Sequence, residues 1–183
     1  MEYDLSKRPV QRPSWPTIVE GMEVSAKRLR EIRPEDGTKI EHAIKRMDIK
    51  PTFDLEEAKK RVSHGFYFIT LQLEDKIIGW DWAGVDKVYF DQFNCHIQLR
   101  KGHVFSFNTY IEKAYRGRGL NSIVVKGKLY ELVKDGYGKI WGLAHKWNQA
   151  SIKSFENMNW KFLGNYNFIK LFFLNLRFPP KGI

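Results

Sequence analysis

The most informative segment of this chain is Val104-Phe-Ser-Phe-Asn-Thr-Tyr-Ile-Glu-Lys-Ala-Tyr-Arg-Gly-Arg-Gly-Leu-Asn121. Residues 104–111 are rich in aromatic and β-branched side chains, a composition that favours a strand. Arg116 to Asn121 predicts a tight turn that opens a helix, because apolar residues recur at helical spacing from Leu120 to Val133. A helix that begins in such a turn directs free N–H groups and the positive end of its dipole at one place. The stretch therefore predicts an anion-binding site.

The two glycines of the turn, Gly117 and Gly119, have no Cβ atom, so their backbone can take unusual angles and approach a ligand closely. Arg116 and Arg118 add positive side chains. Taken alone, the pattern also fits an ordinary strand-to-helix turn with surface arginines. The turn lacks the third glycine of a dinucleotide-binding loop and the Gly-Lys-Ser/Thr sequence of an ATPase phosphate loop.

Two segments carry a resemblance to a known family. Tyr115-Arg-Gly-Arg-Gly-Leu120 resembles the pyrophosphate-binding loop, Arg/Gln-x-x-Gly-x-Gly/Ala, of the GNAT superfamily of acyl-CoA-dependent N-acetyltransferases, although Asn121 departs from its last small position. Asn148-Gln-Ala-Ser-Ile-Lys-Ser-Phe-Glu-Asn-Met-Asn-Trp160 resembles the family's Asn-x-x-Ala-x-x-x-Tyr-x-x-x-Gly-Phe segment, with Phe155 in place of tyrosine and Asn-Trp in place of Gly-Phe. The resemblance covers residues 28 to 176, and two motifs at the family's usual separation are more specific than either alone.

The fold class that the resemblance implies is α/β (α+β): a mixed, mostly antiparallel sheet with helices on both faces. The order of elements along the chain agrees, because strands and helices are intermixed. Residues 1–27, with prolines among polar and basic groups, predict an extended N-terminal arm, and residues 28–183 predict a single GNAT-like domain. Strands are expected at 28–33, 66–73, 76–82, 88–90, 95–99, 104–111, 139–145, 160–166 and 168–176, and helices at 34–47, 55–62, 120–133 and 150–158.

Net charge, cysteine content and apolar runs limit the kinds of ligand and the cellular compartment to expect. A net charge of +10 favours an anionic ligand or surface, and CoA, nucleic acid and acidic lipid all qualify. Nucleic acid is the less expected of these, because no aromatic RNA-binding signature and no Cys/His finger is present. The single cysteine, Cys95, excludes an intramolecular disulfide and a Cys-rich zinc site, and we expect no metal. With no apolar run near the ~20 residues that cross a bilayer and no signal peptide, a cytoplasmic protein is expected.

Acetyl-CoA is the co-substrate that the resemblance implies. Backbone N–H groups of the Arg116 to Asn121 turn would bind its pyrophosphate. In GNAT proteins the central and fifth strands splay apart, and pantetheine pairs with the backbone of the central strand, here Asn108 to Ile111. Asn148 would lie at this cleft, although it also fits a polar cap of the last helix. The residues expected to contact CoA are Tyr110, Ile111, Arg116, Gly117, Arg118, Gly119, Leu120, Asn121, Asn148 and Phe155.

The attacking amine must lose a proton, and three residues are candidate bases. His145 is preferred because it ends the expected fifth strand, close to where the resemblance places the thioester. His103 opens the central strand and Glu112 follows it. For each of the three, an ordinary surface or hydrogen-bonded residue is the alternative, and an amine can also lose its proton before it binds.

The resemblance implies that a tyrosine on the last helix usually donates a proton to the leaving thiolate. Phe155 stands at that position here, and a phenyl ring cannot donate a proton. Ser154, Tyr110 or water could protonate the thiolate. A thiol pKa of about 8.5 also lets the thiolate leave unassisted near neutral pH. The third alternative is that the activity has been lost.

The acceptor is open to an amino sugar, a small amine and a protein N-terminus or lysine. Trp80 and Asp81, with Trp82, Asp86 and Asp91, are candidates to line a pocket for a cationic amine, and core packing is the alternative for the tryptophans. The predicted function is transfer of an acetyl (acyl) group from acetyl-CoA to a primary amine by direct attack in a ternary complex. The alternative is a non-catalytic CoA-, anion- or nucleic-acid-binding module of the same fold. A homodimer is an open expectation.

Overall fold

The computed structural model describes residues 1–7, 10, 13–14, 16–90, 95–165, 167–171 and 174–178, with the backbone alone for 90 and from 167 onward. The helices are α1 (Pro34–Lys45), α2 (Leu55–Ser63), α3 (Leu120–Lys134) and α4 (Gln149–Asn157), with a short 3-10 helix at Lys113–Tyr115. The strands are β1 (Glu2–Asp4), β2 (Thr17–Val19), β3 (Met22–Leu29), β4 (Tyr67–Leu73), β5 (Lys76–Val85), β6 (Lys87–Phe90), β7 (Cys95–Gln98), β8 (His103–Ile111), β9 (Lys139–Gly142), β10 (Asn167–Leu171) and β11 (Leu174–Phe178).

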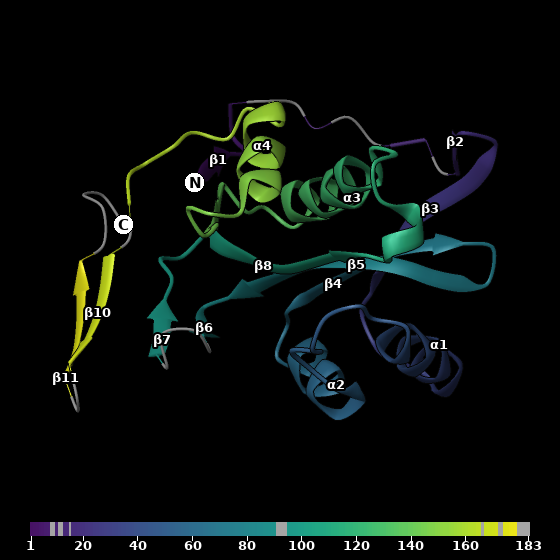
Figure 1. Cartoon of the computed structure of the whole chain (residues 1–183), viewed down its shortest axis with the longest axis horizontal. Helices are drawn as coiled ribbons and strands as arrows, with labels where there is room; N and C mark the ends of the chain where they lie inside the picture. Colours follow the sequence, from purple (N-terminus) through teal and green to yellow (C-terminus); the bar gives the residue numbers. More distant parts are fainter. Residues whose placement is uncertain are drawn as a thin grey trace.

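One seven-stranded sheet organises the chain, in the order β1-β9-β8-β5-β4-β3-β2. Its neighbouring strands are antiparallel except for β8 and β9, which are parallel. Helices α1 and α2 cover one face of the sheet, and α3 and α4 lie on the other (Figure 1). The mixed, mostly antiparallel α/β fold expected from the sequence is therefore confirmed.

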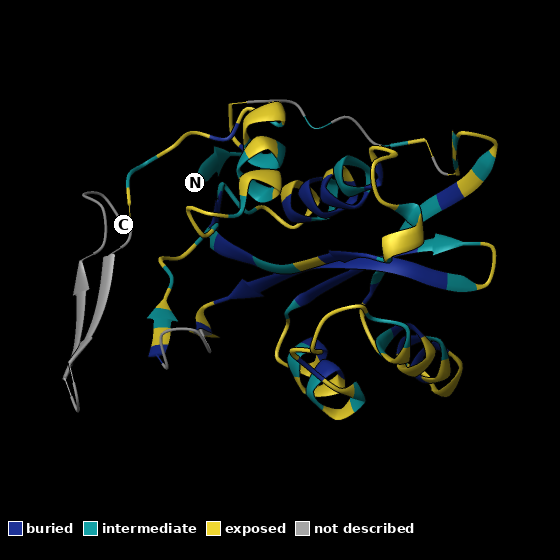
Figure 2. Cartoon of the chain, in the orientation of Figure 1, coloured by how far each residue is buried: buried dark blue, intermediate teal, exposed yellow. Residues whose placement is uncertain are grey.

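Helices α1, α2 and α3 begin where the sequence predicts and bury apolar residues, whereas α4 begins one residue earlier than predicted, at Gln149. Pro34 occupies the first turn of α1, and Asp54 caps α2 by accepting a hydrogen bond from the N–H of Glu57 at 2.8 Å. Ile40 of α1 and Ala58 of α2 are buried against the sheet, in one apolar cluster with Trp80 and Trp82 of β5 and Phe68 of β4. The middle strands of the sheet are the most buried part of the chain (Figure 2).

The N-terminal residues differ from the expected arm. Within residues 1–27 the structure places β1, β2 and most of β3 in the main sheet. β1 pairs with the outer edge of β9, and β3 runs over Met22–Leu29 where a strand was predicted at 28–33. Prolines and charges made this region resemble an arm, but pairing with β4 and β9 satisfies its backbone groups. Those partners are distant in sequence.

The C-terminal strands also differ from the prediction. The fifth strand, β9, ends at Gly142 and not at His145, and Lys161 forms only an isolated bridge with Glu2. In place of strands at 160–166 and 168–176, β10 and β11 form a separate two-stranded sheet, and residues 166, 172 and 173 lie outside the described part of the chain. The physical reason is that β1 occupies the edge of β9 on which a closing strand would pair.

The strands expected at 88–90 and 95–99 are present as β6 and β7, which pair antiparallel as an additional hairpin between β5 and β8. It leads directly into β8, so it lies at the end of the sheet where the central strand begins. Among the described helices, none combines the length and the apolar character that crossing a membrane requires.

Candidate active site

The central feature of the site is the point where β8 and β9 separate. Their pairing runs from His103 with Lys139 to Ser106 with Gly142, and β9 ends there. β8 continues to Ile111 beyond this last pair. On the side of β9, the second half of β8 can therefore offer backbone groups to another extended chain.

A β-bulge lies in β8 just beyond this separation. Trp80 of β5 pairs with Tyr110 and Trp82 pairs with Phe107, so Asn108 and Thr109 together face Asp81. Asn108 has a φ of 51°, in the left-handed region that asparagine tolerates better than most residues. A bulge leaves its extra residue outside the ladder and redirects the side chains beside it. The strand predicted to hold pantetheine is thus irregular where the opening begins.

The glycine turn connects this strand to α3 as predicted. Gly117 and Gly119 have φ angles of 81° and 74°, and Gly119 is the N-cap residue of α3. A Cβ atom would meet nothing within 4 Å at either glycine, so the backbone angles and not crowding require glycine there. The glycine turn follows the unpaired half of β8 in the chain, so the N-terminus of α3 comes directly after the end of β8 that is not paired with β9.

The two arginines of the turn are held by carboxylates. The guanidinium of Arg116 donates to both carboxylate oxygens of Asp48, at 2.8 and 2.7 Å, and its Nε donates to the carbonyl of Ile111 at 2.8 Å. Arg118 pairs with Glu20 at 2.9 Å. The hydrogen bonds from Arg116 hold the pKa of Asp48 below its ordinary value. These contacts engage both guanidinium groups, and the backbone N–H of Arg116 donates to the carbonyl of Lys113. The N–H groups from Gly117 to Asn121 are therefore the candidates in this turn to bind an anion.

The last helix meets the turn through a hydrogen bond from Asn121 Nδ2 to Ser154 Oγ, at 2.6 Å. Asn148 caps α4, because its side chain accepts a hydrogen bond from the N–H of Ser151 at 3.1 Å. The ring of Phe155 contacts the ring of Trp160, with centroids 4.7 Å apart. The structure therefore brings α4 against the start of α3, and it gives Asn148 the capping contact that the sequence left as an alternative.

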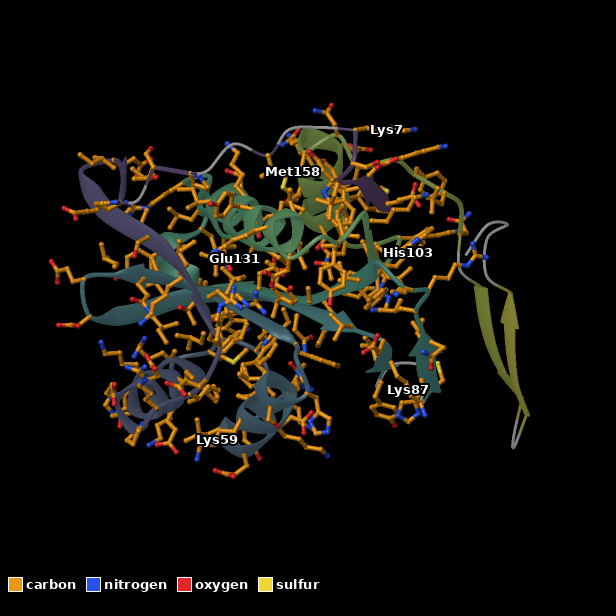
Figure 3. All side chains as sticks on the ribbon, turned by 180° about the vertical axis from the view of Figure 1, so that it is seen from behind. Lys7, Lys59, Lys87, His103, Glu131 and Met158 are labelled. Atoms are coloured by element: carbon orange, nitrogen blue, oxygen red, sulfur yellow. The ribbon has the colours of Figure 1, made fainter. Side chains whose placement is uncertain are left out.

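The three candidate bases have different surroundings. His103 lies in the half of β8 that is paired with β9, toward the end of the sheet that carries β6 and β7 (Figure 3). Its Nδ1 accepts a hydrogen bond from Trp141 Nε1 at 2.9 Å, and burial lowers its pKa. Glu112 accepts hydrogen bonds from Arg46 at 3.2 Å and Lys76 at 3.1 Å. His145 is exposed in the segment between β9 and α4.

The candidate acceptor residues lie mostly in the core. Trp80 and Trp82 are buried on the α1/α2 face with Phe53 and Phe68, where their rings make stacked and edge contacts. Asp81 is buried on the opposite face. Asp86 is exposed after β5, and Asp91 lies outside the described residues. Burial of the tryptophans favours the core-packing alternative for them.

A buried lysine is the feature that sequence reasoning missed. Lys128 of α3 is fully buried and pairs with Asp81 at 2.5 Å. Burial raises the pKa of the Asp81 carboxyl and lowers the pKa of the Lys128 ammonium, while each charge opposes the shift of the other. The signal was present in the sequence, since Lys128 lies on the apolar side of the predicted helix between Val125 and Leu129. No comparable sequence pattern indicated that Asp48 pairs with Arg116.

Comparison with known proteins agrees with this geometry. A family model described as the acetyltransferase (GNAT) family matches residues 27–160, which include β8, the glycine turn and α4. The comparison with curated proteins gives no match. Among solved structures, AAC(6')-Iy in complex with the bisubstrate analogue CoA-S-monomethyl-acetylneamine has a TM-score of 0.62 and 11% identity, over 81% of this chain and 98% of that chain.

Two further solved structures have the same fold. The ribosomal-protein-S18-alanine N-acetyltransferase from Escherichia coli has a TM-score of 0.55 and 16% identity, over 80% of this chain and 79% of that chain. The aminoglycoside acetyltransferase meta-AAC0020, from an uncultured soil metagenomic sample, has a TM-score of 0.55 and 12% identity, over 82% of this chain and 95% of that chain. The match to the family model covers most of the sequence, and the chain belongs to the acetyltransferase (GNAT) family.

Proposed function

We propose that this N-acetyltransferase uses the opening between β8 and β9 to transfer the acetyl group of acetyl-CoA to a primary amine by direct attack in a ternary complex. One observation carries the site assignment. The half of β8 that extends beyond the Ser106–Gly142 pair leads into the Gly117 and Gly119 turn at the start of α3. An extended backbone edge and a helix N-terminus are thus continuous, which suits a cofactor with an amide-containing arm and a pyrophosphate.

In this proposal, the first N–H groups of α3 bind the pyrophosphate, as at other helix N-termini. The pantetheine arm pairs with the backbone of Asn108 to Ile111, and the thioester lies near the bulge. There the amine nitrogen attacks the thioester carbonyl carbon, the new C–N bond forms and the C–S bond breaks. Coenzyme A leaves as its thiolate and the amine proton passes to a base.

We assign the base to His145. Glu112 is engaged by two cationic side chains, and His103 lies in the paired half of β8. His145 follows β9 in an exposed segment that leads to the cap of α4. Because Phe155 has no proton to donate, the proposal lets the thiolate leave unassisted or take a proton from water, which the thiol pKa of about 8.5 permits near neutral pH.

The acceptor class is a second part of the proposal. The solved structures of similar fold include enzymes named for aminoglycosides and for the alanine of a ribosomal protein. Both classes are therefore the first acceptors to assay, by release of free CoA thiol. We further propose a cytoplasmic enzyme, since Cys95 is a buried free thiol. Light scattering would test the expected homodimer.

Thermal unfolding with and without acetyl-CoA tests the proposed function. A ligand that binds only the native state at 100 times its Kd stabilises it by about 2.7 kcal/mol. For a chain of this size, that raises Tm by roughly 5–10 °C. An unchanged Tm with acetyl-CoA would contradict the proposal. A raised Tm without acetyl transfer to any amine would favour the non-catalytic CoA-binding alternative.

Asp48→Asn is expected to strengthen CoA binding by about 2- to 5-fold at low salt, because it removes a carboxylate that now occupies Arg116 beside the phosphate site. The gain should shrink as salt is raised. Isothermal calorimetry measures it. Asp75→Asn is the matched control, since Asp75 is an exposed carboxylate paired with Lys39 at 2.9 Å, away from the turn. Weaker binding by Asp48→Asn would mean that the carboxylate positions Arg116 for the ligand.

A further inference from the structure

The Asp81–Lys128 pair is connected to both sides of the bulge in β8. Lys128 Nζ lies 2.5 Å from Asp81 Oδ2 and donates to Ser106 Oγ, also at 2.5 Å. Thr109 Oγ1 donates to Asp81 Oδ1 at 2.8 Å. Asp81 and Lys128 are fully buried, whereas Thr109 lies at the exposed surface of the strand. One ion pair thus joins β5 and α3 to β8 just before and just after the irregular residue.

The bulge is what allows both contacts. In a regular strand, side chains alternate between the two faces of the sheet, so Ser106 and Thr109 would point to opposite faces. The extra residue at Asn108 shifts this alternation by one position. Both hydroxyl groups consequently reach the face covered by α3, where the ion pair lies. If the bulge were lost, one of the two hydrogen bonds would be lost with it.

A buried ion pair contributes little net stability to a protein core compared with apolar side chains. Removing two charges from water carries a large desolvation penalty, and well-packed apolar residues of similar volume are often as stable or more stable. The directional contacts of this pair are made with Ser106, two residues before Asn108, and with Thr109, the residue after it. Geometry therefore explains the pair better than stability does.

We propose that Asp81 and Lys128 are positioning residues that hold the bulge of β8 in the geometry required for acetyl transfer. This inference rests on the proposed function, which places the thioester at the bulge. Asp81 and Lys128 touch neither cofactor nor acceptor in this scheme. They act through Ser106 and Thr109, which set the direction of the backbone groups at Asn108.

The test replaces the pair by apolar residues in the double variant Asp81→Leu, Lys128→Met. A single substitution would leave a buried charge without its partner, and the double variant avoids this. We expect a folded protein whose kcat falls by about 10- to 100-fold, the scale of a misplacement of about 1 Å at a reacting centre. The Kd of CoA should change by less than about 3-fold, because the phosphate turn is untouched and only part of the strand that pairs with pantetheine is disturbed. Amide hydrogen exchange at 106–110 should become faster, with that of β4 unchanged.

Two further variants make the result decisive. Thr109→Val removes only the hydroxyl group and should reproduce a smaller loss of kcat with faster exchange at the bulge. If the double variant does not fold, kcat and amide exchange at 106–110 measured on Thr109→Val test the proposal instead. Leu29→Ala removes buried apolar volume from β3 on the α1/α2 face, with β4 between it and β5, so it touches neither the ion pair nor the bulge. It should lower Tm while leaving kcat and exchange at 106–110 near wild type.

The proposal is overturned if kcat is unchanged, if kcat falls without faster exchange at 106–110, or if Leu29→Ala lowers kcat equally. The exchange comparison requires no CoA. A wild-type protein that transfers no acetyl group would therefore refute the proposed function, while the exchange data would still decide whether the pair holds the bulge.

Discussion

Gly119→Val is expected to abolish CoA binding while the protein stays folded. Gly119 has a φ of 74° at the N-cap of α3, and a β-branched residue rarely adopts that conformation. Its strain, about 1–3 kcal/mol, is relieved if the turn changes conformation, and the N–H groups at the start of α3 then point elsewhere. Calorimetric titration with CoA should show no binding, and circular dichroism should show an unchanged helix content.

Gly136→Val is the matched control. Gly136 follows the other end of α3 and has a φ of 82°, and a Cβ atom added there, as at Gly119, would meet nothing within 4 Å. Its substitution imposes the same kind of backbone strain far from the turn, so it should cost stability without loss of CoA binding. Normal CoA affinity in Gly119→Val would show that the turn is not the phosphate site.

His145→Ala is expected to lower kcat by at least about 100-fold with CoA affinity little changed. A positioned general base typically contributes roughly 100- to 10,000-fold to the rate. The acidic limb of the rate–pH profile should disappear with the imidazole. The side chain is exposed, with its ring stacked on Trp147 at a centroid distance of 4.9 Å, so the substitution should leave folding intact. Steady-state kinetics over a range of pH measures both effects.

His42→Ala, in the exposed part of α1, is the control for loss of a surface histidine and should keep the full rate. If His145→Ala retains most of its rate and the acidic limb, the assignment of the base is wrong. His103 and Glu112 are then the next residues to replace. A loss of activity in Glu112→Gln would have to be separated from loss of its pairs with Arg46 and Lys76.

The parts of this protein that depend on local pattern could be predicted from the amino-acid sequence. The aromatic and β-branched run of β8 and the helical spacing of α3 predicted a strand and a helix. The left-handed turn between them follows from Gly117 and Gly119, because few other residues take those angles. The cap of α2 could also be predicted, because the acceptor, the Asp54 side chain, and the donor, the N–H of Glu57, are only three residues apart.

The contacts that join residues distant in sequence became visible in the folded chain and could not be predicted from local pattern. The pairing of β1 with β9 left β10 and β11 to form their own sheet, which composition could not foretell. Asp48 reaches Arg116 because the segment after α1 passes beside the glycine turn. Asp81 meets Lys128 because α3 lies across β5 at the bulge. Each contact depends on three-dimensional packing. The apolar side of α3 indicated that Lys128 would be buried, but nothing in the sequence indicated that Asp81 would be its partner.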